Sequence, residues 1–489
     1  MDIKVAKQEI SNSIRAYLSK NAKGEYLIPT IRQRPILLIG PPGIGKTAIM
    51  EQVASENKVA LVSYTMTHHT RESAIGIPQI VNMHYNKESF QATEYTMSEI
   101  ITEIYRKMNS TNLKEGILFL DEINCVDQSL APAILRFLQC KTFGTHRIPD
   151  GWVVAAAGNP KEYNSSVREF DIVTLDRLKK MEIEPNFEVW REYAYSSRIN
   201  TAIISFLYNR PENFYSIDAS STDKTFVTAR GWQDLSDMLN AYEGLKLDVT
   251  KEFVLEYIQY PDIANEFIEY YSNYVMCINE NKFINILTGQ DTKTVLNIID
   301  KLEPEMKNAV MIYIVQELAN TFYECDYQKL YSQYVVEMAA EVGRLYEKSR
   351  SSYRSDTYSV TEGMRQELDR QIEANFLTNN EISAMRNAIK FVDDIALKYA
   401  SGASEMLYIA EIYEEIQKEF EPIKNHYQEF FDGTKAVLKN ICDFVKKAFK
   451  GKEYDAFMHE MLMNKHITEF IRNELADEYG DLLNYTPSN

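Results

Sequence analysis

The sequence predicts an α/β core, a parallel sheet with helices on both faces, followed by a long region that is almost entirely helical. Before about residue 185, short apolar runs rich in β-branched residues alternate with helical patterns, as expected of strands covered on both faces. From about residue 186, apolar residues recur at three- and four-residue spacing instead. Glycine and proline mark the same change, because eleven of the 18 glycines and ten of the 14 prolines lie before residue 250.

Five apolar runs are the predicted strands of the sheet. They are PILLIG at 35–40, VALVSYTM at 59–66, ILFLDEI at 117–123, WVVAAAG at 152–158 and KMEIE at 180–184. Between the second and third runs, residues 77–96 partly alternate apolar and polar residues around Asn86-Lys87-Glu88. This pattern predicts a β-hairpin inserted into the core.

The helical region carries apolar stripes such as Ile412, Ile416 and Phe420, which are expected to face a core. Long charged helices of this kind could also form a coiled-coil arm. The heptads are not sustained, however, and are interrupted at Pro422, Gly433 and Gly451. A compact helical domain is therefore the favoured interpretation.

Charge and composition restrict the possible partners and compartment. The formal net charge of −18 disfavours general nucleic-acid binding, since that binding depends on Lys and Arg neutralising phosphates, although a local basic pore stays possible. The sequence has no run of 18 apolar residues and no signal-peptide pattern, which predicts a cytoplasmic protein without a membrane span. Five scattered cysteines without a CxxC pair are expected to be buried thiols.

A glycine loop directly follows the first predicted strand. GPPGIGKT at 40–47 fits the pattern GxxxxGK[ST], with a predicted helix at 48–56 after it. Glycine lets the loop N–H groups close on phosphate oxygens, and the helix N-terminus favours the same negative charge. Lys46 is expected to reach the β and γ phosphates, and the Thr47 hydroxyl to bind Mg²⁺. The predicted nucleotide-binding residues are Gly40, Pro41, Pro42, Gly43, Ile44, Gly45, Lys46, Thr47 and Ala48.

Two acidic residues end the third predicted strand, in ILFLDEIN at 117–124. Ligands bind at the C-terminal ends of strands in α/β sheets. Asp121 is suited to hold Mg²⁺ through water together with Thr47, because Mg²⁺ prefers oxygen ligands and keeps several waters. Glu122 is then placed to polarise a water for attack on the γ-phosphate. Asn159, at the end of the fourth strand, is expected to lie between the acids and the γ-phosphate.

Taken together, GPPGIGKT, FLDEIN, AAAGNP, and the later LDR and TARGW resemble the AAA+ ATPases, and among them the MoxR-like branch. The resemblance covers about residues 1–245, and 275 at most. It implies ATP as the nucleotide, an AAA+ core at 1–185 and a helical lid at 186–275. The residue matching Asn159 is sensor 1 in that family, which helps position the lytic water. The predicted hairpin resembles the helix-2 insert of the same clade.

Two arginines gain roles from this resemblance. Arg177 matches the arginine finger, which enters the nucleotide site of a neighbouring subunit and so implies a ring, expected to be hexameric. Arg168 is the second candidate for the finger, and a surface Arg177 paired with Asp176 or Glu182 is the plain alternative. Arg230 matches sensor 2, at the start of a lid helix whose usual proline is replaced by Ala229.

His68 and His69 follow the second predicted strand and could suggest a metal site. Adjacent strand residues face opposite sides, and no Cys or carboxylate cluster accompanies the pair. We therefore expect a loop that contacts the lid, a partner or a substrate.

The resulting hypothesis is an Mg²⁺-dependent ATPase ring that remodels or assembles a protein client. MoxR-like relatives often work with a partner carrying a von Willebrand factor A domain, and none is evident in this chain. Residues 276–489 match no family that we can name and are expected to be the partner or client domain. Two alternatives stay open: a motor or switch in a nucleic-acid-processing system, and a slow nucleotide-gated scaffold.

Overall fold

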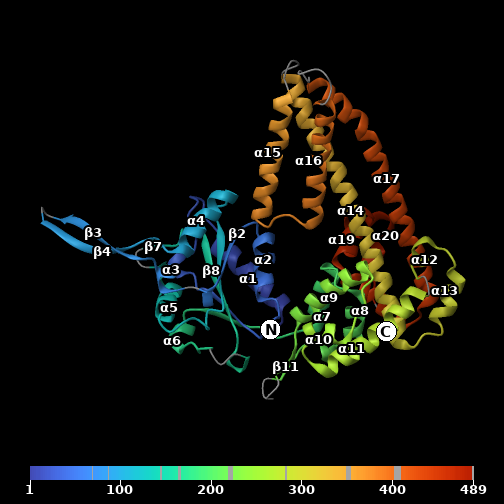
Figure 1. Cartoon of the computed structure of the whole chain (residues 1–489), viewed down its shortest axis with the longest axis horizontal. Coiled ribbons are helices and arrows are strands. Elements are labelled where there is room, and N and C mark those ends of the chain that lie inside the picture. The colour runs from blue at the N-terminus through green and yellow to red at the C-terminus, as the bar shows by residue number, and fades with distance from the viewer. Residues whose placement is uncertain are drawn as a thin grey trace.

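The computed structural model describes residues 1–68, 70–85, 88–143, 146–163, 167–218, 224–280, 283–348, 354–400 and 409–486. Figure 1 shows an α/β core, a two-stranded hairpin that projects from one side of it, and a helical arm that rises from the other side. The remaining helices lie below the arm and beside the core. Along the chain the core comes first, with the hairpin inserted in it, and the remaining helices lie partly before and partly after the arm.

The core contains one five-stranded parallel sheet in the order β2-β5-β8-β1-β9. Its strands are β1 (Ile36–Ile39), β2 (Ala60–Thr65), β5 (Gly116–Asp121), β8 (Trp152–Gly158) and β9 (Lys179–Glu182). The register pairs Leu37 with Ala156 and Thr65 with Asp121. All five strand predictions are confirmed. Because β1 lies between β8 and β9, the loop that follows it emerges inside the sheet, where α/β folds bind ligands.

Helices cover both faces of this sheet, as predicted. On one face, α1 (Ile3–Tyr17) and α2 (Lys46–Glu56) pack on alternate strand residues such as Leu38 and Phe119. On the other face, α4 (Glu99–Thr111) and α5 (Ala131–Cys140) pack on the intervening residues, such as Leu37 and Leu118. The short helices of the core are η1 (Thr30–Arg32), η2 (Met66–His68), α3 (Arg71–Ile75), η3 (Lys161–Tyr163) and α6 (Ile172–Leu175).

The predicted hairpin is present as β3 (Pro78–Tyr85) and β4 (Glu88–Tyr95), paired antiparallel from Pro78 to Tyr95. Its turn residues Asn86 and Lys87 lie outside the described residues. Two further antiparallel ribbons have no counterpart in the sequence predictions, because two- and three-residue strands are too short for a periodic signal. They are β6 (Thr142–Phe143) with β7 (His146–Arg147), and β10 (Ser216–Asp218) with β11 (Thr225–Val227).

Five helices after the core form what we call the lid segment, together with the short η4 (Pro211–Phe214) and the β10–β11 ribbon. They are α7 (Phe187–Ser196), α8 (Thr201–Asn209), α9 (Ala229–Leu245), α10 (Lys251–Tyr257) and α11 (Pro261–Glu280). Trp232, Leu235 and Leu239 of α9 are buried on one face, as the sequence pattern predicts. The expected boundary at residue 275 falls inside α11, so the division into lid and C-terminal domain stays a proposal.

The lid segment shares one hydrophobic core with C-terminal helices. This core extends from Trp190 and Phe206 to Phe322, Phe457 and Phe470. The C-terminal elements outside the arm are α12 (Asn285–Thr288), α13 (Thr292–Ile299), α18 (Lys452–Met463), α19 (Lys465–Glu474), α20 (Ala476–Tyr479) and η5 (Gly480–Asn484).

A buried ion pair also links the lid segment to the C-terminal helices. Arg191 of α7 and Glu460 of α18 are 3.3 Å apart, with side chains 4% and 0% exposed. The Tyr195 hydroxyl donates to the second Glu460 oxygen at 2.5 Å. Breaking such a buried pair is strongly destabilising, because it leaves one charge uncompensated.

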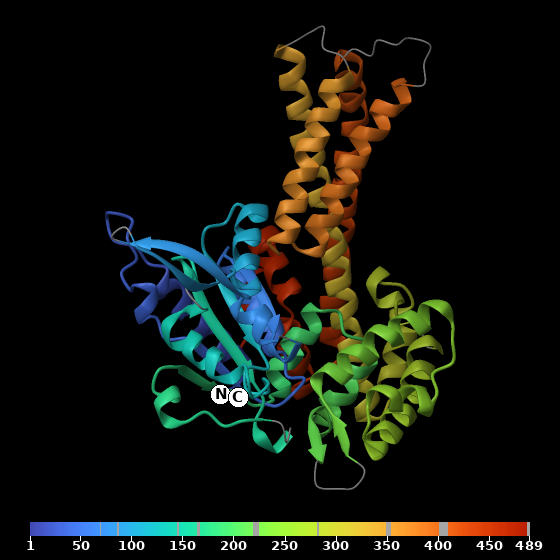
Figure 2. The same ribbon diagram turned by 60° about the vertical axis from the view of Figure 1, so that its left-hand side comes forward.

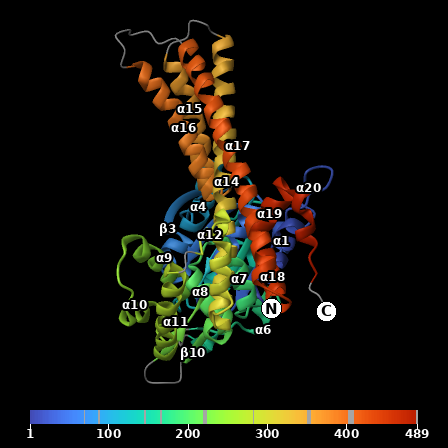
Figure 3. The same ribbon diagram turned by 90° about the vertical axis from the view of Figure 1, so that its right-hand side faces the viewer.

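The prediction of a compact C-terminal domain was wrong for the arm. The arm consists of α14 (Pro304–Lys348), α15 (Arg354–Glu373), α16 (Asn379–Ala400) and α17 (Ile409–Ala448). Figures 2 and 3 show these helices side by side, rising well beyond the core. Pro422 and Gly433 lie within α17, and only Gly451 separates helices. In a bundle of several helices, the apolar stripe of each helix is buried by more than one neighbouring helix. The sequence therefore does not need the continuous heptad repeat of a two-stranded coiled coil.

Other sequence expectations can be compared directly. Among the described residues, no helix combines the length and apolarity needed to cross a membrane. Of the five free cysteines, only Cys277 and Cys325 are buried, whereas Cys140 is exposed. Of the two adjacent histidines, His68 ends η2 and His69 lies outside the described residues.

Candidate nucleotide site

The glycine loop lies between β1 and α2, as its pattern requires. Gly43 and Gly45 adopt left-handed backbone angles, with φ of +72° and +92°, which glycine tolerates and other residues rarely do. Close packing also requires glycine at two positions. A Cβ at Gly40 would lie 2.8 Å from the Ile183 carbonyl oxygen, and one at Gly43 would lie 2.9 Å from the Thr228 hydroxyl. The loop is therefore pressed against both the core and the lid segment.

Lys46 is the first residue of α2 and is buried. Its ammonium donates to the Gly40 and Pro41 carbonyls, both at 2.8 Å, and to Asn159 Oδ1 at 2.9 Å. Burial lowers the pKa of Lys46 to about 8, although the Asp121 carboxylate opposes this shift. The structure thus places Asn159 beside the loop lysine.

Thr47 and Asp121 also meet. The Thr47 hydroxyl donates to Asp121 Oδ2 at 2.8 Å, and the backbone N–H of Glu122 donates to Asp121 Oδ1 at the same distance. A hydroxyl and a carboxylate are hard oxygen donors of the type that Mg²⁺ prefers, and this ion usually keeps several waters and takes further ligands from phosphates. These two residues therefore fit the magnesium role proposed for them.

Glu122 stands on a strained piece of backbone directly after β5. Its φ of 55° lies in the left-handed region, an arrangement that clusters at functional sites when found in a side-chain-bearing residue. Its carboxylate accepts a 2.7 Å hydrogen bond from the Thr67 hydroxyl. We did not single out Thr67 from the sequence. Pairing of β2 with β5 was the available signal, because it places the residues after both strands side by side.

Asn124 is a second residue that sequence reasoning missed. It is buried, its side-chain amide donates to the Asn159 carbonyl at 2.8 Å, and its Oδ1 accepts from the Asn159 N–H at 3.3 Å.

The lid segment contacts the glycine loop directly. Arg230 follows the N-cap Thr228 in α9, and its backbone N–H donates to the Gly43 carbonyl at 3.1 Å. The exposed Arg230 side chain is near enough to the Lys46 ammonium to lower the pKa of Lys46 further. Tyr215, another residue without a sequence signal, donates from its hydroxyl to the Pro42 carbonyl at 2.6 Å. Burial raises the pKa of this tyrosine well above its ordinary value.

Comparison with known proteins agrees with this geometry. Residues 36–174 match the family model described as ATPase family associated with various cellular activities (AAA). The chain contains an AAA ATPase domain. It is accordingly an ATP hydrolase, as the resemblance to the AAA+ ATPases implies. No curated protein sequence matches the chain.

Solved structures similar to the chain include three of RuvB from Thermotoga maritima. The first, a RuvB mutant, is 15% identical, with 55% of this chain and 69% of that chain covered at a TM-score of 0.30. A second mutant is 16% identical, with coverage of 52% and 68% at 0.29. The RuvB Holliday junction branch migration motor is 16% identical, with coverage of 55% and 69% at 0.29. Identities and TM-scores this low support no statement about function.

The two finger candidates both lie on the surface of the α/β core. Arg177 follows α6, and its guanidinium donates to Gln139 of α5. This partner differs from Asp176 and Glu182, and Glu182 is instead paired with Lys180 at 2.6 Å. Arg168 is exposed too, and its backbone N–H donates to the Asn124 carbonyl at 2.9 Å. Within the described part of the chain, neither guanidinium bonds to the glycine loop, as a finger acting on a neighbouring subunit requires.

Proposed function

We propose that this ATPase assembles as a ring and uses Mg²⁺-dependent hydrolysis to remodel a protein client, in the manner of MoxR-like proteins. One observation carries the proposal: the lid segment contacts the glycine loop through Arg230 and Tyr215 and shares its hydrophobic core with the C-terminal helices. Packed residues therefore connect the phosphate-binding loop to the arm through the lid segment, so that a movement at the loop is transmitted to the arm. The arm is our candidate for the client or partner module.

In the proposed reaction, each residue has a separate task. Mg²⁺ held by Thr47 and Asp121 would neutralise phosphate charge. Glu122 accepts a proton from the attacking water, and Asn159 orients that water. Lys46 and Arg230 stabilise negative charge that builds up on the phosphates. An arginine of a neighbouring subunit, Arg177 in our assignment, completes the site.

The surface beside Arg177 supports assembly into a ring. Ile172 and Val173 of α6 are 84% and 62% exposed, although both are β-branched apolar residues. Neighbouring apolar side chains that stay this exposed favour a protein contact. A copy of the chain seated here would cover them and bring Arg177 to its own nucleotide site. We propose six subunits by analogy with the family.

Partner dependence of hydrolysis tests the proposal against its alternatives. ATP turnover is measured alone, with duplex DNA, and with proteins that co-purify with the chain in the presence of ATP, including any with a von Willebrand factor A domain. We expect stimulation by a co-purifying protein and none by DNA, in keeping with the net charge of −18. Several-fold stimulation by DNA alone would instead identify a nucleic-acid motor. Slow turnover unaffected by either would identify a nucleotide-gated scaffold.

A further inference from the structure

The segments that follow β5 and β8 are joined by one side chain, that of Asn124. Backbone pairing of the two strands ends at Leu120 and Ala156, and the N–H of Ile123 still reaches the Ala157 carbonyl at 2.9 Å. Beyond that point, the Asn124 amide bonds to both backbone polar groups of Asn159, at 2.8 and 3.3 Å. Asn124 is only 5% exposed, so these bonds are largely shielded from water.

Gly158 leaves the space that this arrangement needs. A Cβ at Gly158 would lie 2.5 Å from Asn124 Oδ1 and 2.7 Å from its Cγ, closer than side chains tolerate. Gly158 and Asn124 therefore pack directly against each other. The close contact explains why position 158, the last of β8, is a glycine and not a residue with a side chain.

We propose that Asn124 is a positioning residue for ATP hydrolysis, which fixes the backbone of Asn159 so that its side chain stays at Lys46. This inference rests on the role proposed above for Asn159. The position of Asn159 Oδ1, 2.9 Å from the Lys46 ammonium, depends on where its backbone is held. A side-chain amide can donate to the carbonyl and accept from the N–H of the same residue, because it carries an NH₂ group and a carbonyl oxygen. A carboxylate at 124 would place a charged acceptor against the Asn159 carbonyl, and alanine would leave both groups without their partner.

The test compares Asn124→Asp and Asn124→Ala with Asn159→Ala, the corresponding double variants, and Glu122→Gln. We expect kcat to fall about 10- to 100-fold in either Asn124 variant with KM for ATP within about threefold, because an orientation for the chemical step is lost while binding is kept. Adding Asn124→Asp to Asn159→Ala should cost nothing more, since both changes remove one function. Asn200→Asp, at a buried asparagine of the lid segment, controls for the burial of an added carboxylate.

Normal kcat in Asn124→Asp, or losses that multiply in the double variant, would overturn the positioning role. Thermal unfolding of each variant separates this result from simple instability. If Asn159→Ala and Glu122→Gln both retained turnover, the proposed roles of Asn159 and Glu122 would be wrong. That result differs from normal kcat in Asn124→Asp alone, which would contradict only the positioning role.

A different set of contacts supports a second, independent inference about the arm. The C-terminal end of α15 rests on the AAA ATPase domain. Lys107 of α4 donates to the Glu373 carbonyl at 2.7 Å, and the Ser110 hydroxyl donates to the Glu373 carboxylate. Lys58 donates to the Phe376 carbonyl at 3.3 Å and lies 4.8 Å from the centre of its ring. Lys107 therefore meets the negative end of α15, where carbonyls lack partners, and Lys58 binds the chain three residues beyond that end.

The two attachments of the arm differ greatly in strength. Its base belongs to the hydrophobic core shared with the lid segment, whereas Glu373 and Phe376 touch the AAA ATPase domain mainly through polar contacts at the surface. The Glu373 side chain is 45% exposed, and exposed ion pairs contribute little to stability. A movement of the lid relative to the core would hence keep the first attachment and release the second.

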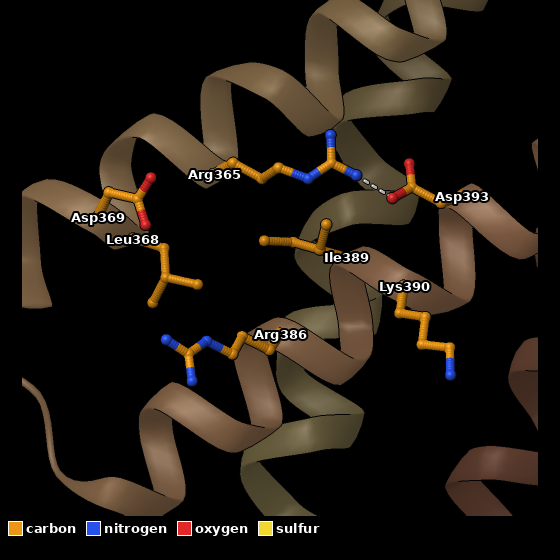
Figure 4. A pocket seen from close by; sticks show the side chains of 7 residues that line it. All are labelled: Arg365, Leu368, Asp369, Arg386, Ile389, Lys390 and Asp393. Carbon is orange, nitrogen blue, oxygen red and sulfur yellow. Dashed lines mark hydrogen bonds and ion pairs between the residues drawn. The ribbon is translucent and has the colours of Figure 1, made fainter.

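The C-terminal half of α15 packs into the arm, because Leu368 belongs to one hydrophobic cluster with Val342 of α14 and Ile389 of α16. Arg365 of α15 is ion-paired with Asp393 of α16, at the edge of a cavity of about 270 Å³ between the two helices (Figure 4). Leu368 and Ile389, which line the same cavity, are buried. On the core side, Lys58 lies two residues after the end of α2, whose first residue is Lys46 of the glycine loop. One helix thus connects the phosphate site to this contact.

We infer that the contact of Glu373 and Phe376 with Lys58, Lys107 and Ser110 is a releasable latch that opens when nucleotide turnover moves the lid. The first test ties the contact shut: Ser110→Cys with Glu373→Cys, in a Cys140→Ser background, joined by a short cleavable bis-thiol reagent. We expect turnover to fall at least about tenfold on cross-linking and to return on cleavage, with ATP binding retained. The two single-cysteine variants, treated identically, are the controls.

The second test opens the latch with Lys107→Glu and Phe376→Ala. Hydrogen exchange of residues 373–378 should then be fast without nucleotide, whereas in the unaltered chain it should become fast only with ATP. Unchanged turnover in the cross-linked protein would overturn the inference. So would exchange at 373–378 that is indifferent to ATP in the unaltered chain.

Discussion

The Thr67 hydroxyl holds the Glu122 carboxylate by a 2.7 Å hydrogen bond. Thr67 follows β2, which borders β5 on one side, whereas the glycine loop follows β1 on the other side, beyond β8. The bond therefore draws the proposed base toward β2 and away from the phosphates. This arrangement restrains the side chain that we propose as the base.

Thr67→Val should accordingly raise basal turnover. A hydrogen bond to a charged group is worth about 1.5–3 kcal/mol, so its loss should increase kcat by roughly 10- to 150-fold if Glu122 then swings toward the phosphates. KM for ATP should not change, because Thr67 has no role in binding. Steady-state kinetics would measure both constants, and Thr70→Val, which alters only the cap of α3, is the matched control. A lower kcat in Thr67→Val would show that the bond holds Glu122 in its working position instead.

ATP affinity should depend on pH through Lys46. Its pKa is lowered to about 8 by burial, so the ammonium loses its charge as pH rises through that value. Phosphates bind the charged form better, and affinity should fall above pH 8, by up to about tenfold per pH unit. Lys46→Arg should bind with little pH dependence, because the guanidinium stays charged. Titration with a fluorescent ATP analogue from pH 7 to 9.5 would measure this, and an equal slope in both proteins would exclude Lys46 as the titrating group.

Lys141 should reduce the stability of the core below neutral pH. It is 2% exposed, and burial lowers its pKa to about 7. The pKa of Lys141 is thus lower in the folded protein than in the unfolded chain, where it is about 10.4. Folding is therefore less favourable at acidic pH, and this free-energy cost decreases as the pH rises from about 7 toward about 10.4. Lys141→Met should thus increase the free energy of unfolding by a few kcal/mol at pH 6, roughly 2–4, and by less at pH 9. Urea unfolding would test this, with the exposed Lys114→Met expected to have no effect at either pH.

Catalysis across a subunit boundary predicts complementation between two inactive variants. Arg177→Ala should lower kcat by about 10³-fold or more without weakening ATP binding, as expected of a finger. Mixed with Lys46→Ala subunits, which supply an intact Arg177, it should regain part of its turnover. Arg168→Ala is the matched comparison, because both arginines are exposed. Recovery with Arg168→Ala and not with Arg177→Ala would reassign the finger.

The nucleotide site could be predicted because its residues occupy fixed places on a regular scaffold. Gly40 to Thr47 follow one strand and Asp121 and Glu122 end another, so strand order alone brings them to one edge. Thr67, Asn124 and Tyr215 were missed because each acts through a single contact with a motif residue or its backbone. Contacts of this kind depend on register and loop path, which a pattern of residue types does not specify.

The arm shows a different limit of sequence reasoning. Ile412 and Ile416, recognised as part of an apolar stripe, are buried. Pro422 and Gly433 were treated as breaks, yet α17 continues through both. Local helix preference was outweighed by packing against neighbouring helices, and that packing involves residues far apart in the sequence.

Turnover by Glu122→Gln, measured beside ATP binding by the same protein, tests the central claim most directly. A general base contributes about 10²–10⁴-fold to a rate, so kcat should fall by at least about 100-fold while the Kd for ATP stays within about twofold. Turnover near the wild-type rate in a protein that binds ATP normally would contradict the assignment of Glu122 and, with it, the proposed arrangement of the site.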